Sequence, residues 1–285
     1  MHQRLTQYLG IALLLIIAGC GGSDTDQTGE QSYADTMAQQ HADDTPEATA
    51  MAQEPMIPVV GATVAYGTTP AGESITGYIA RPENPDSVLD ARGMDPATSE
   101  LPGLVVIHEW WGLNDNIRAA TRRLAGQGYE ALAVDLYEGG VAETPSEARG
   151  LMEQAMQNRD RLIVNLEAAH NFLSEEIGSP RVGVMGWCFG GGMALNAALA
   201  DPETLDATVI YYGRVSDVER SELETLQMPI MGHFGMEDSS IPVESVRQFE
   251  QTLNELDKNA QIYLYEGAGH AFSNPSGQNY DPEAA

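Results

Sequence analysis

Short apolar runs alternate with segments of helical periodicity from about residue 57 onward, and this alternation constrains the fold more than any other feature. Continuous apolar runs are typical of strands that are covered on both faces. Strands separated by helices form parallel βαβ units. The sequence therefore predicts an α/β fold with a doubly wound, mostly parallel sheet and helices on both faces. Buried strands are expected at residues 104–107, 131–136, 182–185, 207–212, 229–234 and 261–265, with a hairpin-like pair (59–66 and 75–80) before them and helices at 115–127, 146–157, 159–176, 189–200 and 243–256.

The N-terminus has the pattern of an export signal. Arg4 precedes an apolar stretch at residues 9–18, which is too short to span a bilayer because about 20 residues are needed. It fits the apolar region of a secretory signal peptide, and the small residues before Cys20 resemble the lipobox of a bacterial lipoprotein. We therefore expect a signal peptide at residues 1–19, lipid on Cys20, and a protein anchored by that lipid to the cell envelope. An ordinary signal peptide with a coincidental cysteine is the alternative.

Residues 20–56 begin with the cysteine that is expected to carry lipid and contain few large apolar side chains. Such a segment cannot bury enough surface to offset the entropy lost on ordering, so it is predicted to be a disordered acidic tether. The folded domain is then residues 57–285. Gly21 directly after the cysteine favours the outer membrane in a cell that has one.

The chain is strongly acidic, with 42 Asp and Glu residues against 14 Lys and Arg residues and a net charge of −28. An acidic surface repels phosphates, so a nucleic acid partner is not expected. Two interpretations remain open: a highly soluble surface, or adaptation to high salt. At 1 M salt the Debye length is ~3 Å, so like charges repel each other less and can lie closer together.

The segment GWCFG at residues 186–190 lies between a predicted strand and a predicted helix. This is the nucleophile-elbow pattern, with Cys188 in place of serine. Glycines allow the sharp turn, and the following helix directs its amide groups and its positive end at the thiol, which lowers the thiol pKa. If Cys20 carries lipid, Cys188 has no disulfide partner. Cys188 is therefore the candidate nucleophile.

An acid and a histidine follow the elbow in the chain order of α/β-hydrolases. Asp238 follows the strand at residues 229–234, and His270 follows the strand at 261–265 within a glycine-rich loop. Glu237 is the rival for the acid, but Asp238 is preferred because it lies further beyond the strand end. The sequence predicts a Cys188–His270–Asp238 triad.

Four segments together resemble the dienelactone hydrolase (carboxymethylenebutenolidase) family, and the resemblance runs from about residue 57 to the C-terminus. Residues 108–112, 135–137, 186–191 and 267–272 read HEWWG, DLY, GWCFGG and GAGHAF. The resemblance implies an α/β-hydrolase fold that uses neither metal nor cofactor. It also implies that Glu109 helps to activate the thiol, and that the Trp110 and Phe189 amides bind the oxyanion. Trp111 and Trp187 are further candidates for lining the substrate site.

The sequence departs from this family in two respects. Arginines that hold the substrate carboxylate in dienelactone-cleaving members are replaced by EGGV at residues 138–141 and AFSN at 271–274. Losing such contacts costs about 1.5–3 kcal/mol for each charged hydrogen bond, so a neutral ester or lactone is the expected substrate. In addition, only 15 residues follow His270, where the family carries a final helix. Part of the sheet is therefore expected to be uncovered.

These observations predict a hydrolase that cleaves a small ester or lactone by acyl transfer to Cys188, outside the cytoplasm. Two other classes remain open. The chain could be a non-catalytic lipoprotein that uses the fold to bind a ligand. An exported thiol-redox protein is less favoured because there is no C-x-x-C motif.

Overall fold

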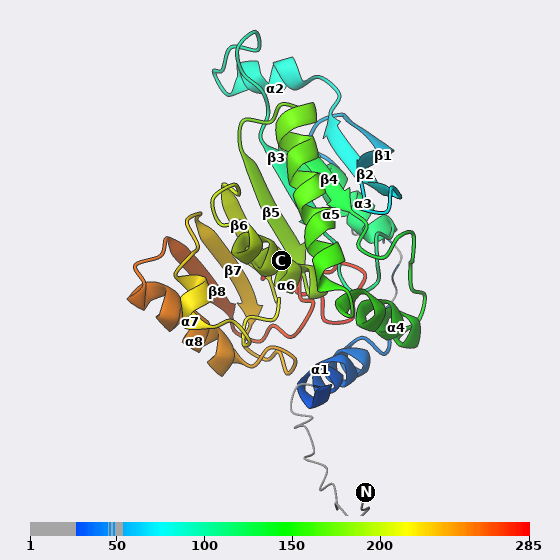
Figure 1. Ribbon diagram of the computed structural model, residues 1–285, viewed down its shortest axis with the longest axis vertical. Coiled ribbons are helices and arrows are strands. Elements are labelled where there is room, and N and C mark those ends of the chain that lie inside the picture. Colours follow the sequence, from blue (N-terminus) through cyan, green and yellow to red (C-terminus); the bar gives the residue numbers. More distant parts are fainter. Residues whose placement is uncertain (1–26, 45, 47, 49–53) are drawn as a thin grey trace, which may run out of the picture.

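A computed structural model describes residues 27–44, 46, 48 and 54–285 (Figure 1). The expected signal peptide and Cys20 lie outside the described residues. Among the described residues, no helix combines the length and the apolar character that crossing a membrane requires.

Eight strands form one sheet in the order β1-β2-β4-β3-β5-β6-β7-β8. The pairs β1/β2 and β2/β4 are antiparallel and all other neighbours are parallel, which confirms the predicted mostly parallel sheet. Every residue of β3 and β4, near the middle of this order, is buried, as their continuous apolar sequences predict. The strands are β1 (Val59–Thr68), β2 (Ser74–Pro82), β3 (Gly103–Ile107), β4 (Glu130–Val134), β5 (Val182–Trp187), β6 (Ala207–Tyr211), β7 (Ile230–Gly235) and β8 (Ala260–Tyr265).

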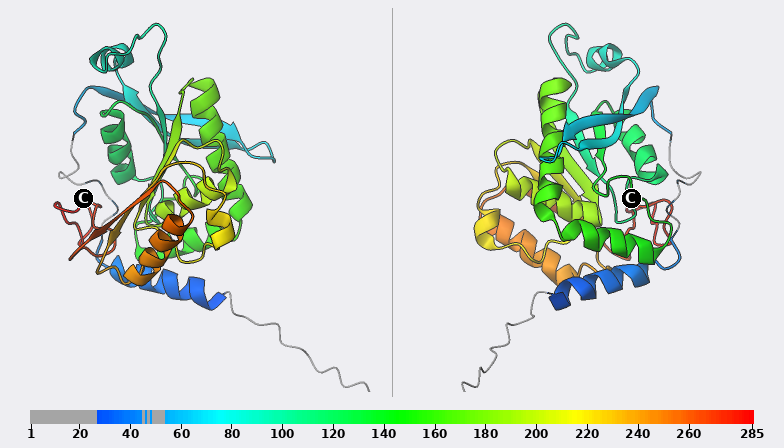
Figure 2. Two further views of the ribbon diagram at one scale, coloured as in Figure 1. Left: turned by 90° about the vertical axis from the view of Figure 1, so that its left-hand side faces the viewer. Right: turned by 45° about the vertical axis from the view of Figure 1, so that its right-hand side comes forward.

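Helices cover both faces of this sheet. Figure 2 shows α3 on one side and α5 and α6 on the other, so the predicted doubly wound arrangement is confirmed. The helices after the first strands are α2 (Pro85–Ala91), α3 (Asp115–Ala125), α4 (Pro145–Met156), α5 (Arg159–Asn171), the π-helix η1 (Phe172–Glu176), α6 (Phe189–Ala200), α7 (Arg220–Leu223) and α8 (Val243–Glu255).

Local sequence signals explain where these helices begin. The side chain of Asn114 accepts a hydrogen bond from the amide of Ile117 at the start of α3, and Thr144 caps α4 in the same way. α2 was not expected, because residues 82–103 are rich in Pro, Asp and Gly. Its short sequence is nevertheless well suited to a helix start, with Asn84 as the N-cap and Pro85 as the first helical residue.

The DLY segment has a structural role beside the sheet. The carboxylate of Asp135 accepts hydrogen bonds from the amides of Tyr137 at 2.9 Å and Gly139 at 2.6 Å. The backbone carbonyl of Asp135 accepts another from Asn165 on α5 at 3.0 Å. These bonds fix the loop that follows β4, at the carboxyl edge where sites of this fold class are built.

The segment that was predicted to be a disordered tether contains a helix. α1 (Gln27–Gln40) contacts α4 along one edge of the domain (Figure 1). Ala34 and Met37, three residues apart, are 1% and 0% exposed, so one face of α1 is buried. The prediction of disorder is therefore wrong for residues 27–44. A few apolar residues at helical spacing are sufficient to dock this segment.

The last strands leave part of the sheet partly exposed. Among the described residues, no helix follows β8, and the chain continues to Ala285 through turns. α8 packs against one face of β7 and β8, and side chains that alternate with the buried ones point to the other face. On that face Met231 is 37% and Tyr263 is 43% exposed.

Candidate active site

Cys188 lies at a strained turn between β5 and α6. It has a φ of 56°, a conformation that residues other than glycine rarely adopt. A Cβ atom on Gly186 would lie 2.2 Å from the carbonyl oxygen of Gly190, so glycine is required for this close approach. The turn places the thiol beside the first residue of α6, Phe189, whose amide has no acceptor within its own helix.

His270 and Asp238 are brought together from two loops at the carboxyl edge of the sheet. His270 Nδ1 lies 2.7 Å from Asp238 Oδ2, and both side chains are fully buried. The other oxygen of Asp238 accepts hydrogen bonds from the amides of Ser240 at 2.8 Å and Ile241 at 3.0 Å. Glu237 is exposed and takes no part in this network. Of the two candidates for the acid, Asp238 is therefore the one that the structure places against His270.

Cys188 and His270 lie next to each other in the buried site. The Sγ atom of Cys188 and a ring nitrogen of His270 lie within 4.8 Å of each other, and both residues are 0% exposed. Burial raises the pKa of Cys188, but the neighbouring imidazoles outweigh it and lower this pKa from 9.0 to about 6. Burial lowers the pKa of His270, but Asp238 and the thiolate outweigh that effect and raise it. The electrostatics favour a thiolate–imidazolium pair.

Glu109 lies in the loop after β3 and is 3% exposed. Its carboxyl oxygens accept hydrogen bonds from Asn274 Nδ2 at 2.6 Å and from the Tyr212 hydroxyl at 3.4 Å. Burial, and next the charge of the Cys188 thiolate, raise the pKa of Glu109 to about 8. A mostly neutral Glu109 at pH 7 does not repel the thiolate.

The three tryptophans occupy different positions. Trp187 lines a small cavity of about 30 Å³, together with Glu109 and Asn274. Trp110 and Trp111 are 0% and 1% exposed, and their rings contact His41 rather than this cavity.

Arg123 on α3 also lines this cavity. No salt bridge or hydrogen bond to its side chain occurs within the part of the chain that the structure describes. In the sequence, arginines were expected only in the loops after β4 and after His270, so this cation from a helix was not predicted.

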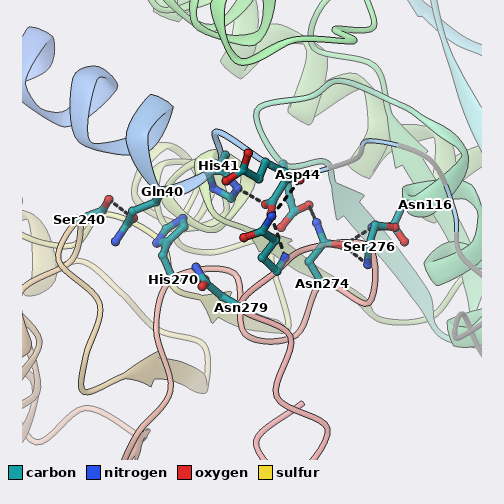
Figure 3. Close-up of polar contacts among 12 residues, drawn as sticks. Gln40, His41, Asp44, Asn116, Ser240, His270, Asn274, Ser276 and Asn279 are labelled. Carbon is teal, nitrogen blue, oxygen red and sulfur yellow. Dashed lines mark hydrogen bonds and ion pairs between the residues drawn. The ribbon is translucent and has the colours of Figure 1, made fainter.

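The end of α1 covers the thiol. We call residues 33–44 the covering segment. From it, His41 points toward His270, with ring centroids 5.4 Å apart (Figure 3). His41 is 0% exposed, and its Nδ1 lies 2.5 Å from Asp44 Oδ2. Burial lowers the pKa of His41, but the Asp44 carboxylate and the Cys188 thiolate raise it to about 9.

Several polar contacts attach the covering segment to the domain. Gln40 donates to the Ser239 hydroxyl at 2.6 Å and accepts from the Ser240 hydroxyl. Asp44 accepts from the amide of Gln278 at 2.8 Å. Further contacts are the Asp35–Arg149 ion pair and the Arg214 guanidinium 5.4 Å from the Tyr33 ring. The covering segment therefore contacts α4, the loops after β6 and β7, and the residues after β8.

Sequence reasoning brought together Cys188, His270, Asp238 and Glu109 but missed His41 and Asp44. His41 was placed in the tether and given no role. The signal that could have found it is the spacing of Ala34, Met37 and His41, which lie on one face of a helix. That signal is weak because polar residues surround it.

Comparison with known proteins identifies the family. The model of the dienelactone hydrolase family matches residues 89–285. The chain belongs to the dienelactone hydrolase family. A proposed carboxymethylenebutenolidase of Saccharolobus solfataricus is 30% identical over 251 residues, which cover 75% of this chain and 90% of the relative. The protein usf of Aquifex pyrophilus is 34% identical over 188 residues, covering 64% of this chain and 81% of that protein.

Solved structures agree with this assignment. The crystal structure of a proposed dienelactone hydrolase from Klebsiella pneumoniae superposes with a TM-score of 0.67 at 26% identity, and covers 80% of this chain and 94% of that one. The fold is therefore that of the α/β-hydrolases, and this member of the family is an ester hydrolase.

Proposed function

We propose that this protein hydrolyses small carboxylic esters or lactones with Cys188 as the nucleophile. The observation that carries the proposal is the position of His270, whose Nδ1 is held by Asp238 while its other ring nitrogen faces the buried thiol. A nucleophile, a base and a group that orients the base are the three parts that acyl transfer requires.

The reaction proceeds in two steps. The Cys188 thiolate attacks the carbonyl carbon, and the imidazolium of His270 gives its proton to the leaving alkoxide. His270 then takes a proton from water, which attacks the thioester and releases the acid and the thiolate. The proposed donors to the oxyanion are the amide of Phe189, which directly follows Cys188 at the start of α6, and the amide of Trp110 in the loop after β3.

Substrate must displace the covering segment before it reaches the thiol. Cys188 has no exposed surface while His41 lies beside it. An open form of the covering segment is therefore part of the catalytic cycle in this proposal. A small substrate requires the least opening.

Two features of the protein bear on the charge of the substrate, and one favours a neutral substrate while the other favours an anion. The net charge of −28 disfavours an anion, and we propose a neutral ester or lactone on that ground. Arg123 favours the second candidate, an ester with a carboxylate, because this cation lines the cavity that Glu109 also lines. Comparing a neutral ester with its carboxylate analogue in Arg123→Gln separates the two: kcat/KM for the carboxylate ester falls only if Arg123 binds it.

We also propose that the enzyme acts outside the cytoplasm, held to the cell envelope by lipid on Cys20. The order Arg4, apolar stretch, Cys20 supports this proposal. Mass spectrometry of the protein expressed in a bacterial host tests it. Mature chains that begin at a diacylated Cys20 support it, and unprocessed chains that keep residues 1–19 contradict it.

Hydrolysis of p-nitrophenyl esters and simple lactones by the full chain tests the catalytic proposal. We expect turnover that Cys188→Ala and His270→Ala each reduce by at least about 10³-fold, as for other triads. His170→Ala, which changes a partly exposed histidine on α5, is the matched control and should retain full activity. Unchanged rates in both site variants would refute the triad. A folded protein without turnover on a broad panel would instead favour a ligand-binding role.

A further inference from the structure

Three buried side chains, the Cys188 thiol and two histidines beside it, form a group with the composition of a metal site. The candidate ligand atoms of His41, Cys188 and His270 all lie within 4.8 Å of one another. All three side chains are 0% exposed. The group therefore combines residues from the covering segment, the elbow and the loop after β8.

The two histidines are oriented as metal-binding histidines are. Nδ1 of His41 is bonded to Asp44, and Nδ1 of His270 is bonded to Asp238. A carboxylate on the far nitrogen fixes the ring and increases the basicity of the near one, which is the usual arrangement around bound zinc. The Nε2 atoms of both rings are buried and have no hydrogen-bond partner within the described residues. Both are thus available to a ligand beside the sulfur.

We propose that His41, Cys188 and His270 bind a divalent transition-metal ion, with Zn²⁺ as the best match. One thiolate and two imidazoles are ligands that Zn²⁺ prefers, and three protein ligands leave a fourth position for water. Zinc–sulfur and zinc–nitrogen bonds of ~2.3 and ~2.0 Å separate tetrahedral ligands by ~3.5 Å. The candidate ligand atoms are at most 4.8 Å apart, so the group needs a contraction of at most about 1.3 Å to reach that spacing. On binding, any proton held between the sulfur and the rings is released to solvent.

The bound ion links the covering segment to the nucleophile. Coordination occupies the lone pairs that the thiolate and His270 would use in acyl transfer. It also holds His41, and with it the end of α1, over the site. The metal-bound form is therefore a closed, inactive form, and removing the ion permits the covering segment to open. Metal binding requires the three side chains but does not require that the enzyme turn over an ester.

Titration of the full chain with Co²⁺ tests the site, because Co²⁺ replaces Zn²⁺ and reports on its ligands by absorption. We expect one ion per chain and a thiolate-to-cobalt charge-transfer band that Zn²⁺ abolishes by competition. Cys188→Ser should remove the band. His41→Ala should weaken Co²⁺ binding at least 10-fold. Asp44→Asn keeps His41 as a ligand but removes the carboxylate that orients its ring, and should weaken Co²⁺ binding about 10- to 100-fold.

His170→Ala is the matched control for a histidine outside the group and should bind Co²⁺ as the unmodified chain does. The proposal is overturned if no thiolate-to-cobalt band appears, or if His41→Ala binds Co²⁺ as tightly as the unmodified chain does. It is also overturned if His170→Ala loses as much Co²⁺ affinity as His41→Ala does. The readout is a spectrum recorded without substrate. A protein that binds cobalt but hydrolyses no ester would therefore contradict the proposed function alone, and the reverse result would contradict the metal site alone.

Discussion

Docking of the covering segment should depend on one buried side chain, Met37. This residue is 0% exposed on the inner face of α1, whereas most of the polar contacts of the covering segment involve exposed or partly exposed groups. Met37→Ala removes buried apolar contacts and leaves His41 in the chain. We expect this substitution to raise the population in which the thiol of Cys188 is accessible.

The size of the effect follows from burial. Truncating a fully buried methionine to alanine costs about 2–5 kcal/mol. If this whole cost reduces the free energy that docks the covering segment, the equilibrium constant for its opening rises roughly 30- to 4,000-fold. The side chains of the Arg149–Asp35 ion pair are partly exposed, and such surface pairs contribute little to stability. Arg149→Ala should therefore change opening by no more than roughly 5-fold.

Labelling of Cys188 by a small alkylating reagent measures opening. The reaction is run with a chelator present and in a Cys20→Ser background, so that one thiol remains. Thermal unfolding of each variant checks that the domain itself is intact. Equal labelling rates in Met37→Ala and the unmodified chain would show that the covering segment does not protect the thiol. Equal acceleration by Arg149→Ala would show that burial of Met37 is not what holds it.

Three further changes have outcomes set by the structure. Gly186→Ala should destabilise the fold by at least about 3 kcal/mol in denaturant unfolding, because its Cβ would lie 2.2 Å from a backbone oxygen. Gly150→Ala on α4, where the added Cβ would have nothing within 4 Å, should instead stabilise the fold by about 0.5–1 kcal/mol. The opposite order of stabilities would contradict the packing at the elbow. Asp238→Asn should lower kcat by about 10⁴-fold, because the amide favours the wrong tautomer of His270; a loss below 10-fold would remove Asp238 from the triad. Burial lowers the pKa of His233 from 6.5 to about 4, so an unfolded chain binds more protons between these values and stability falls as pH falls through that window. For this partly exposed ring the loss should be about 1–2 kcal/mol after solvent screening, and His233→Gln should abolish it in unfolding measured at pH 7 and pH 4; an unchanged difference would contradict the assignment.

The sheet and the proximity of the candidate catalytic residues could be predicted because their signals are local. Each parallel strand is a short apolar run, and Cys188, Asp238 and His270 each follow such a run directly. Parallel strands end at a common edge, so residues far apart in sequence can be placed together from strand ends alone.

Contacts that depend on packing between distant segments were not predictable in this way. Asn274 donates to Glu109 across 165 positions, and neither residue carries a local mark of the other. Arg123 belongs to a helix whose orientation relative to the cavity depends on the packed sheet. The covering segment was missed because most of its residues are polar, which hides the single buried methionine, Met37, in any average of hydropathy. The bonds from Gln40 to Ser239 and from Gln278 to Asp44, which help to attach it, join residues far apart in the sequence.

Trapping the acyl-enzyme tests the central claim most directly. The full chain is mixed with p-nitrophenyl acetate, quenched in acid within the first turnovers and digested, and the acetylated peptide is identified by mass spectrometry. Acyl transfer to the thiol predicts an acetyl group on Cys188 that is absent in Cys188→Ala. Acetylation confined to another residue, or undiminished hydrolysis by Cys188→Ala, would contradict the assignment of Cys188 as the nucleophile.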